Sequence, residues 1–213
     1  MKTTFIMIRH GFSVANNEKR FAGHSDFPLT ELGQLQAKRC AEALKHEKID
    51  AVYSSDLKRA YQTAEPIARS HGLKVIPHKG LREIFAGEWE GKTFDQIDRD
   101  YAEDYSVWKN DIGKAKCTGG ERVSELSGRV LAALTEIAES NCGKTVCIAT
   151  HATPIRAVCT AAAGYPAEDM GKIPWTANAS ISIFEYENGK FCAVCISKTE
   201  HLGELCTSLP KNV

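Results

Sequence analysis

The hydrophobic positions of the chain alternate between two patterns, which predict short buried strands followed by amphipathic helices. Apolar runs typical of strands buried on both faces occupy residues 5–8, 49–53, 74–77 and 145–149. Apolar residues at helical spacing fill residues 30–44, 57–70, 123–137 and 154–162. Helix starts are predicted at Thr30 and in the Ser54-Ser55-Asp56 cluster, because these residue types favour N-caps. The alternation predicts an α/β fold with a mostly parallel central sheet.

Two segments depart from this alternation. Residues 93–116 carry Phe94, Ile97, Tyr101, Tyr105 and Trp108 at spacings of three and four. We interpret this segment as a small helical cap, about residues 92–118, inserted into a single domain that spans residues 1–213. Residues 179–186 and 191–197 flank Asn188-Gly189 and predict a β-hairpin. Its outer strand could pair with the same strand of a second copy in a homodimer. Cover of this strand edge by the C-terminal tail is an equal alternative.

Side chains suited to phosphate chemistry lie at or just beyond the ends of the predicted strands. They are Arg9 and His10 after residues 5–8, Arg59 after residues 49–53, Glu83 after residues 74–77, and His151 after residues 145–149. Ligands bind outside the carboxyl ends of parallel strands. Two arginines and two histidines beside helix N-termini would hold a phosphate dianion, and the carboxylate would serve as a proton donor.

Composition narrows the classes of partner. Lys plus Arg and Asp plus Glu both count 27, so the net charge of zero gives no support for nucleic acid as a partner. The apolar run that follows Lys2 is too short for a signal peptide, and no stretch approaches the length of a membrane span. We therefore expect a cytoplasmic protein without membrane association, whose eight cysteines stay reduced.

An ordered set of motifs resembles the histidine phosphatase superfamily, also called phosphoglycerate mutase-like. The motifs are Arg9-His10-Gly11-x-Ser13-x-x-Asn16, Asp26-x-x-Leu29-Thr30-x-x-Gly33, Ser54-Ser55-x-x-x-Arg59-Ala60-x-x-Thr63-Ala64, Leu81-x-Glu83 with Gly87-x-Trp89-x-Gly91, Gly119-Gly120-Glu121, and Thr150-His151. They extend from about residue 5 to residue 185. The resemblance implies a three-layer α/β/α sandwich of the phosphoglycerate mutase-like type.

The resemblance also implies roles for individual residues. His10 would be the nucleophile that forms a phosphohistidine intermediate, kept neutral by the neighbouring cations of Arg9 and Arg59. These two arginines and His151, assisted by Asn16, would hold the phosphoryl oxygens.

Proton transfer is assigned in the same way. Glu83 would be the general acid that protonates the leaving alcohol and then activates water. Glu88 and Glu90 stay open as alternatives to it. The implied mechanism needs no metal and no cofactor.

Three functions are compatible with these residues. We favour a phosphatase for a small phosphorylated metabolite, because residues 85–91 and the short cap resemble the branch that includes alpha-ribazole and broad-specificity phosphatases. The alternative on the same scaffold is a cofactor-dependent phosphoglycerate mutase. The third, a catalytically silent binding protein, is disfavoured because all the expected catalytic residues are present.

The substrate is not identified by the motifs. Phe12 stands where many family members carry a polar residue, and Ala152-Thr153 replaces a frequent Gly-Gly pair. Phe12 and Trp89 suggest an apolar or aromatic leaving group. Tyr101, Tyr105 and Trp108 of the cap would shape its pocket, although aromatic residues at helical spacing are more often core.

Overall fold

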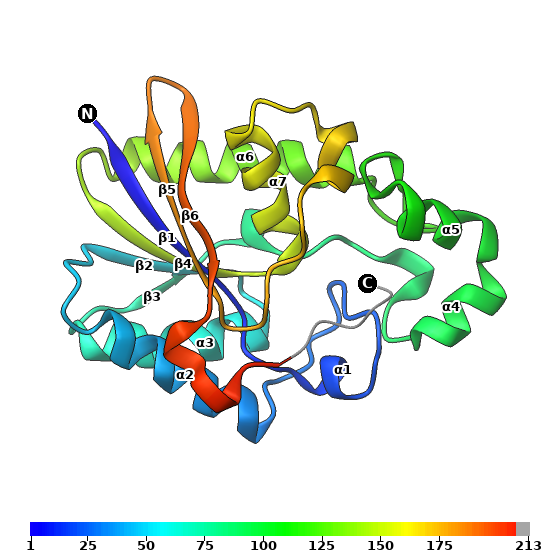
Figure 1. Cartoon of the computed structure of the whole chain (residues 1–213), viewed down its shortest axis with the longest axis horizontal. Helices are drawn as coiled ribbons and strands as arrows, with labels where there is room; N and C mark the ends of the chain where they lie inside the picture. The colour runs from blue at the N-terminus through cyan, green and yellow to red at the C-terminus, as the bar shows by residue number, and fades with distance from the viewer. Residues whose placement is uncertain (208–213) are drawn as a thin grey trace.

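A six-stranded sheet forms the centre of the computed structural model, which describes residues 1–207 (Figure 1). The strand order is β3-β2-β4-β1-β5-β6. The strands are β1 (Thr3–Arg9), β2 (Ala51–Ser54), β3 (Val75–Pro77), β4 (Thr145–Thr150), β5 (Ile181–Glu187) and β6 (Lys190–Lys198).

Four neighbouring strands run in parallel and bring their carboxyl ends to one edge of the sheet. β4 pairs in parallel with both β1 and β2, and β2 pairs with β3. In this register Arg9 lies opposite Thr150, and Ser54 lies opposite Ala149. Only β5 runs antiparallel to its neighbours β1 and β6. The prediction of a mostly parallel sheet is confirmed, and His10 and His151 follow adjacent strands.

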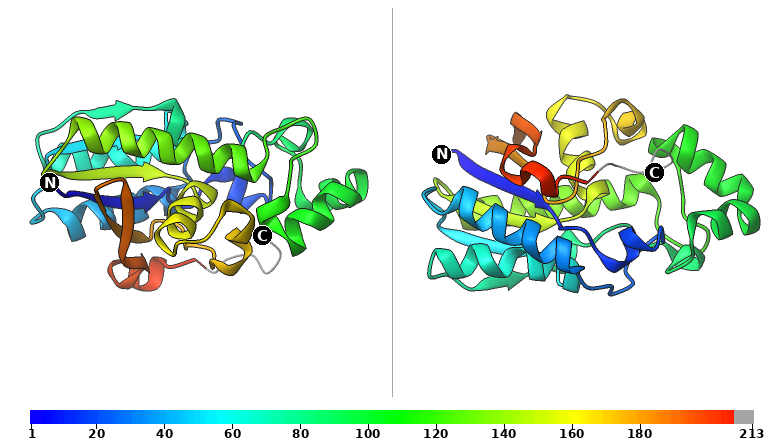
Figure 2. Two further views of the ribbon diagram at one scale, coloured as in Figure 1. Left: turned by 90° about the horizontal axis from the view of Figure 1, so that it is seen from above. Right: turned by 60° about the horizontal axis from the view of Figure 1, so that its bottom comes forward.

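Helices cover both faces of the sheet (Figure 2). One face carries α2 (Glu31–Leu44) and α3 (Lys58–Ser70), and the other carries α6 (Val123–Ser140) and α7 (Ala152–Ala162). Side chains of β1 alternate between the two cores: Ile6 and Ile8 pack with the α2–α3 layer, whereas Phe5 and Met7 pack with the α6–α7 layer. The three-layer sandwich is therefore confirmed.

The start of α2 follows the predicted local rule. The side chain of Thr30 accepts a hydrogen bond from the amide of Gly33 at 3.1 Å, as an N-cap should. Gly33 also permits a close approach of two segments, because a Cβ atom there would lie 2.1 Å from the carbonyl oxygen of Phe12. The helix is thereby held against the loop that follows His10.

The start of α3 differs from the prediction. The N-cap is Leu57, without a side-chain hydrogen bond, and not one of Ser54, Ser55 or Asp56. These three polar side chains bind elsewhere. The hydroxyl of Ser54 donates to a neighbouring carbonyl, that of Ser55 contacts His151, and the carboxylate of Asp56 pairs with Arg82. The three side chains form contacts among the loops at the sheet edge, and none of them is the N-cap of the helix.

The predicted cap segment contains two helices, α4 (Phe94–Asp100) and α5 (Ala102–Asn110), which lie beyond the carboxyl edge of the sheet (Figure 1). A four-residue helix, α1 (Val14–Asn17), follows β1. None of the helices within residues 1–207 has the length and apolar character needed to cross a bilayer.

The β5–β6 hairpin turns at Asn188 and Gly189, whose φ angles of 51° and 77° are those that such tight turns require. After β6, a 3₁₀ helix (Glu200–Leu205) returns to α2, where the amide of Gln36 donates to the carbonyl of Leu205. The described part of the C-terminal tail thus covers α2 and not the edge of β6. Homodimer pairing through β6 and a cytoplasmic location stay predictions.

Candidate active site

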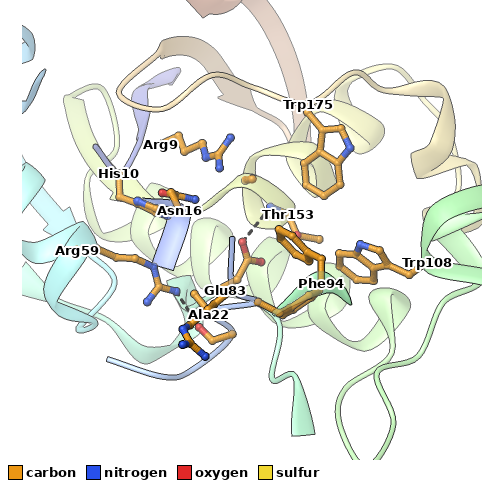
Figure 3. A pocket seen from close by; sticks show the side chains of 14 residues that line it. Arg9, His10, Asn16, Ala22, Arg59, Glu83, Phe94, Trp108, Thr153 and Trp175 are labelled. Carbon is orange, nitrogen blue, oxygen red and sulfur yellow. Dashed lines mark hydrogen bonds between the residues drawn. The ribbon is translucent and has the colours of Figure 1, made fainter. Parts of the chain in front are cut away.

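The carboxyl edge of the sheet opens into a pocket of about 500 Å³ between the sandwich and the cap (Figure 3). Five of the six predicted site residues line it, and the sixth, His151, lies buried behind His10 with the two ring centroids 5.2 Å apart. The lining residues are Arg9, His10, Asn16, Arg20, Phe21, Ala22, Gly23, Arg59, Glu83, Phe94, Trp108, Ala152, Thr153 and Trp175. The structure therefore brings together the residues that the sequence placed at four separate strand ends.

His10 is held with one ring nitrogen directed at the pocket. Its Nδ1 lies 2.8 Å from the carbonyl oxygen of Gly11, a contact in which Nδ1 carries the proton and donates. Nε2 is then left with its lone pair. The backbone of His10 is fixed as well, because its carbonyl accepts from the side chain of Asn178 at 3.1 Å. The arrangement leaves a neutral ring whose Nε2 lone pair has the geometry expected of a nucleophile.

Electrostatics keep this imidazole neutral. Burial lowers the pKa of His10 well below 6.5, and the positive charges of Arg59 and Arg9 lower it further. Protonation would place a third cation between two buried guanidinium groups. The ring therefore stays unprotonated at neutral pH.

The two arginines are anchored by backbone carbonyls, which leaves part of each guanidinium group unused. Nη1 of Arg9 donates to Thr176 at 2.5 Å, and Nη1 and Nη2 of Arg59 donate to Ser25 at 2.9 Å and Gly23 at 2.7 Å. Among the described residues, Nε of Arg9 and Nε of Arg59 are buried without a partner. Burial lowers the pKa of each arginine to about 10, so both stay charged at neutral pH. An oxyanion is the ligand that such a pair of buried cations would bind.

His151 follows β4 as predicted and reaches back toward β2. Its Nε2 lies 2.8 Å from the hydroxyl of Ser55, while its Nδ1 is buried without a partner among residues 1–207. Burial, and then the charge of Arg59, lowers the pKa of His151 well below 6.5. When the Ser55 hydroxyl donates to Nε2, Nδ1 carries the proton and becomes a donor for a bound oxyanion.

Glu83 is the carboxylate that lines the pocket together with Arg9, His10 and Arg59. Its Oε1 accepts from the amide of Ile84 at 2.9 Å, and its Oε2 lies 3.4 Å from the amide of Thr153 at the start of α7. In Figure 3 the carboxylate lies between Arg59 and Thr153. It is placed to exchange a proton with a group bound beside His10.

Neither alternative carboxylate lines the pocket. Glu88 is exposed, and Glu90 is occupied by hydrogen bonds within the loops. The carboxylate of Glu90 accepts from the amides of His24, Ser25 and Ala86 and from the Ser25 hydroxyl. Glu90 thus holds the loop whose carbonyls anchor Arg59, and Glu83 is the one of the three candidates that lines the pocket.

Asn16 is held at the pocket rim by a small hydrogen-bond network. Its Oδ1 accepts from the amide and hydroxyl of Ser13 and lies 3.2 Å from Nδ2 of Asn178. Because Oδ1 is used as an acceptor, the Asn16 side-chain amide keeps its N–H groups for the pocket. Its predicted assisting role is compatible with this orientation.

The far end of the pocket is aromatic. Phe94 and Trp108 line it from the cap, and Trp175 lines it from the segment before β5 (Figure 3). Phe21, from the loop after α1, is a further aromatic lining residue. The ring centroids of Trp108 and Trp175 are 6.4 Å apart. Trp175 stacks on the guanidinium group of Arg156, whose central carbon lies 4.1 Å from the centroid of the indole ring. This end offers apolar surface to a bound ligand.

The prediction that Phe12 and Trp89 contribute to this apolar surface is wrong. Trp89 is fully buried in the core, and Phe12 does not line the pocket. Tyr105 is also core, whereas Trp108 and the pair Ala152-Thr153 do line the pocket. Sequence reasoning missed Trp175, Phe21, Ser55 and Asn178, of which only Ser55 lay within a motif.

Within residues 1–207, no three His, Cys, Asp or Glu side chains gather in an arrangement suited to a metal ion. The independence of the reaction from metal stays a prediction, to be tested with a chelator.

Comparisons with known proteins agree with this geometry. The family model described as histidine phosphatase superfamily (branch 1) matches residues 5–199. The chain is 34% identical over 211 residues to phosphoserine phosphatase 1 of Hydrogenobacter thermophilus, with 98% of both chains covered. It is 32% identical over 203 residues to phosphoglycerate mutase-like protein 4 of Arabidopsis thaliana, covering 93% of this chain and 86% of the relative. The solved structure of Bacillus stearothermophilus YhfR superposes with a TM-score of 0.89 at 30% identity, covering 94% and 99% of the two chains.

Proposed function

Because this chain belongs to the histidine phosphatase superfamily (branch 1), we propose that it is a metal-independent phosphomonoesterase that transfers the phosphoryl group to His10 and then to water. One observation carries the proposal. Nδ1 of His10 is tied to the carbonyl of Gly11, which leaves the Nε2 lone pair to face a pocket that contains Arg9 and Arg59.

In the first step, Nε2 of His10 attacks phosphorus and the bond from phosphorus to the ester oxygen breaks. The unpartnered donors of Arg9, Arg59 and His151 are disposed to hold the three phosphoryl oxygens as charge develops on them. Glu83 gives its proton to the departing oxygen, so that the product leaves as an alcohol. The products of this step are a phosphohistidine and a Glu83 carboxylate.

In the second step, the Glu83 carboxylate takes a proton from water, and the resulting hydroxide attacks phosphorus. The bond from phosphorus to Nε2 breaks, His10 recovers its lone pair, and inorganic phosphate leaves. Glu83 ends the cycle protonated, ready to act again as an acid. The same side chain serves both steps because the leaving oxygen and the attacking water occupy the same side of the phosphoryl group.

The charge distribution of the pocket favours hydrolysis over the mutase reaction. Its cationic lining residues are Arg9 and Arg59 at the phosphate end and Arg20, which is already paired with Glu18. A mutase primed by 2,3-bisphosphoglycerate must bind a second phosphoryl group and a carboxylate. The opposite end presents Phe94, Trp108 and Trp175, which offer no charge for those groups.

The substrate we propose is a small phosphorylated metabolite whose leaving group rests against the aromatic end. The similarity to phosphoserine phosphatase 1 makes phosphoserine the first compound to test. A phosphomonoester with a larger apolar leaving group is the second, because the aromatic side chains would gain contact with it.

The test is phosphate release from a panel of phosphomonoesters, with a chelator present, by the wild type and by His10→Ala. The panel includes phosphoserine, and 3-phosphoglycerate together with 2,3-bisphosphoglycerate. Release that survives the chelator and is lost in His10→Ala supports the proposal, with His46→Ala, an exposed histidine, as the matched control. Isomerisation without net phosphate release would identify a mutase instead, and neither reaction would indicate a binding protein.

A further inference from the structure

The loop that carries Glu83 is held from outside the pocket through its backbone. Four successive carbonyls, of residues 80–83, accept hydrogen bonds from side chains of other elements. Thr150 donates to the carbonyl of Leu81 at 2.7 Å, and His24 lies 2.9 Å from the carbonyl of Glu83. The remaining bonds come from one residue, Arg129 of α6.

Arg129 uses every N–H group that it has. Nη1 donates to the carbonyls of Gly80 and Arg82, both at 3.0 Å, and Nη2 donates to the carbonyl of Glu83 at 3.1 Å. The other two N–H groups form a bidentate pair with Glu121, at 3.0 Å and 2.9 Å. A planar guanidinium group alone matches this set of acceptors, because the ammonium group of lysine has three donors and no fixed fork.

Glu121 holds the other side of the same loop. It belongs to the Gly119-Gly120-Glu121 motif, to which the proposed reaction assigns no role. Its Oε2 accepts from the amide of Phe85 at 3.1 Å, and its own amide donates to the Phe85 carbonyl at 2.8 Å. Gly120 permits this approach, since a Cβ atom there would lie 2.4 Å from the carbonyl oxygen of Phe85. Neither Arg129 nor Glu121 lines the pocket.

The position of the Glu83 carboxylate depends on this backbone. Among the described residues, the carboxylate accepts hydrogen bonds only from backbone amides: that of Ile84, its own neighbour, and that of Thr153 at the long distance of 3.4 Å. Within residues 1–207, no side chain donates a hydrogen bond to it. A shift of the 80–85 loop therefore moves the carboxylate relative to His10, and proton transfer is sensitive to displacements of about 1 Å.

We propose that Arg129, oriented by Glu121, is a positioning residue for proton donation by Glu83, a proposal that rests on the proposed role of Glu83. This role has a kinetic signature. An alkoxide leaving group needs a proton in the transition state, whereas p-nitrophenolate leaves readily without one. Misplacement of Glu83 lowers kcat/KM for alkyl phosphates more than for p-nitrophenyl phosphate, whereas a general loss of structure lowers both equally.

The experiment measures kcat/KM of Arg129→Lys for p-nitrophenyl phosphate and for the alkyl phosphate that the wild type hydrolyses fastest. We expect kcat/KM to fall about 10-fold more for the alkyl phosphate than for p-nitrophenyl phosphate. This difference is a part of the full effect of general acid catalysis. Glu121→Gln should show a smaller loss with the same selectivity, and it provides the test if Arg129→Lys fails to fold. Arg122→Lys, an exposed arginine at the start of α6, should change neither substrate.

Glu83→Gln separates the two ways in which this account can fail. Selective loss in Glu83→Gln with equal losses on both substrates in Arg129→Lys and Glu121→Gln would overturn the positioning role alone. Equal losses in Glu83→Gln itself would overturn the proposed role of Glu83 and the positioning role with it.

Discussion

The two ends of the pocket are built in different ways. The phosphate end consists of Arg9, His10, Arg59 and His151, buried side chains that project from adjacent strand ends or the first turn of a helix. The leaving-group end takes Phe21 from a loop, Phe94 and Trp108 from the cap, and Trp175 from the connection before β5. The proposed chemistry thus rests on the sheet, whereas the proposed leaving-group surface is assembled from three peripheral segments.

The loops around the phosphate end are fixed by a layer of charged residues that do not line the pocket. Glu90 holds the loop that anchors Arg59, and Arg129 with Glu121 holds the loop that carries Glu83. At the aromatic end, Trp175 is held by packing against Arg156, Trp108 and the hydrophobic core. The phosphate end should therefore be intolerant of substitution, and the aromatic end should tolerate it with altered selectivity.

The largest effect should come from Arg59→Ala. This change removes a buried cation that faces the phosphoryl group and leaves the carbonyls of Gly23 and Ser25 without their donor. We expect kcat/KM to fall by about 10³-fold for all leaving groups, as for other cations that stabilise a transferring phosphoryl group. Arg69→Ala, an exposed arginine on the same helix, is the control. A loss of less than about 10-fold would contradict the assignment of Arg59.

A smaller loss should follow Glu90→Gln. The carboxylate accepts four hydrogen bonds, and an amide cannot accept them all because an NH2 group, which only donates, replaces one of the two oxygens. We expect the free energy of unfolding, measured in urea, to fall by about 2 kcal/mol. The loss of kcat/KM should be equal for alkyl and p-nitrophenyl substrates, because Glu90 acts through Arg59 and not through proton transfer. Glu88→Gln, an exposed neighbour, should change neither quantity. Selective loss on alkyl substrates would instead make Glu90 part of the proton-transfer machinery.

Trp175→Ala tests the aromatic end. Removal of the indole takes away apolar contact for the leaving group but leaves the phosphate-binding residues intact. KM for a phosphomonoester with an aromatic leaving group should rise about 10-fold, the equivalent of about 1.4 kcal/mol of lost contact. KM for a small alkyl phosphate should change less, and Tyr165→Ala, an exposed aromatic residue, serves as control. An equal rise for both substrates would show that the rings do not select the leaving group.

The smallest effect is a pH dependence of stability that comes from the phosphate end. His10 and His151 have pKa values well below 6.5 when folded, because of burial and the nearby arginines. The unfolded chain therefore binds more protons than the folded chain below about pH 6.5, and the free energy of unfolding falls as the pH is lowered. Each histidine contributes at most about 1.4 kcal/mol per pH unit.

His10→Gln should reduce this dependence in urea unfolding measured between about pH 5 and pH 7. An unchanged slope would mean that His10 is not held neutral in the folded protein.

The difference between the two ends also explains what the sequence could predict. The grouping of Arg9, His10, Arg59, Glu83 and His151 was predictable because these residues lie at or just beyond strand ends or begin a helix, and parallel strands bring such positions to one edge. Their individual roles came from the resemblance to the histidine phosphatase superfamily. Trp175 and Phe21 lie in loops, where no periodicity says which way a side chain points, and only tertiary packing brings them to the pocket. For the same reason, Phe12 and Trp89 were wrongly predicted at the pocket. Trp89 is buried in the core, and Phe12 does not line the pocket.

The partners of polar clusters were also not predictable, because a cluster with the composition of a helix cap can bind groups elsewhere in the fold. Ser54, Ser55 and Asp56 have the composition of a helix cap, yet they bind His151, Arg82 and a backbone carbonyl. The role of Arg129 depends on carbonyls more than 40 residues earlier in the chain, with separations of 46 to 49 residues, which no local pattern reveals. Local rules therefore predicted most of the elements and the grouping of polar side chains at the strand ends, while the supporting contacts required the folded structure.

The most direct test of the account is to trap the phosphorylated enzyme. Glu83→Gln is mixed with p-nitrophenyl phosphate, whose leaving group needs no proton, and the reaction is quenched in alkali, in which phosphohistidine survives. Peptide mass spectrometry should locate one phosphoryl group on His10, accumulated because the variant cannot activate water for the second step. His10→Ala should give no such label. Absence of a phosphopeptide in Glu83→Gln, or a phosphoryl group on His151 instead, would contradict the assignment of His10 as the nucleophile.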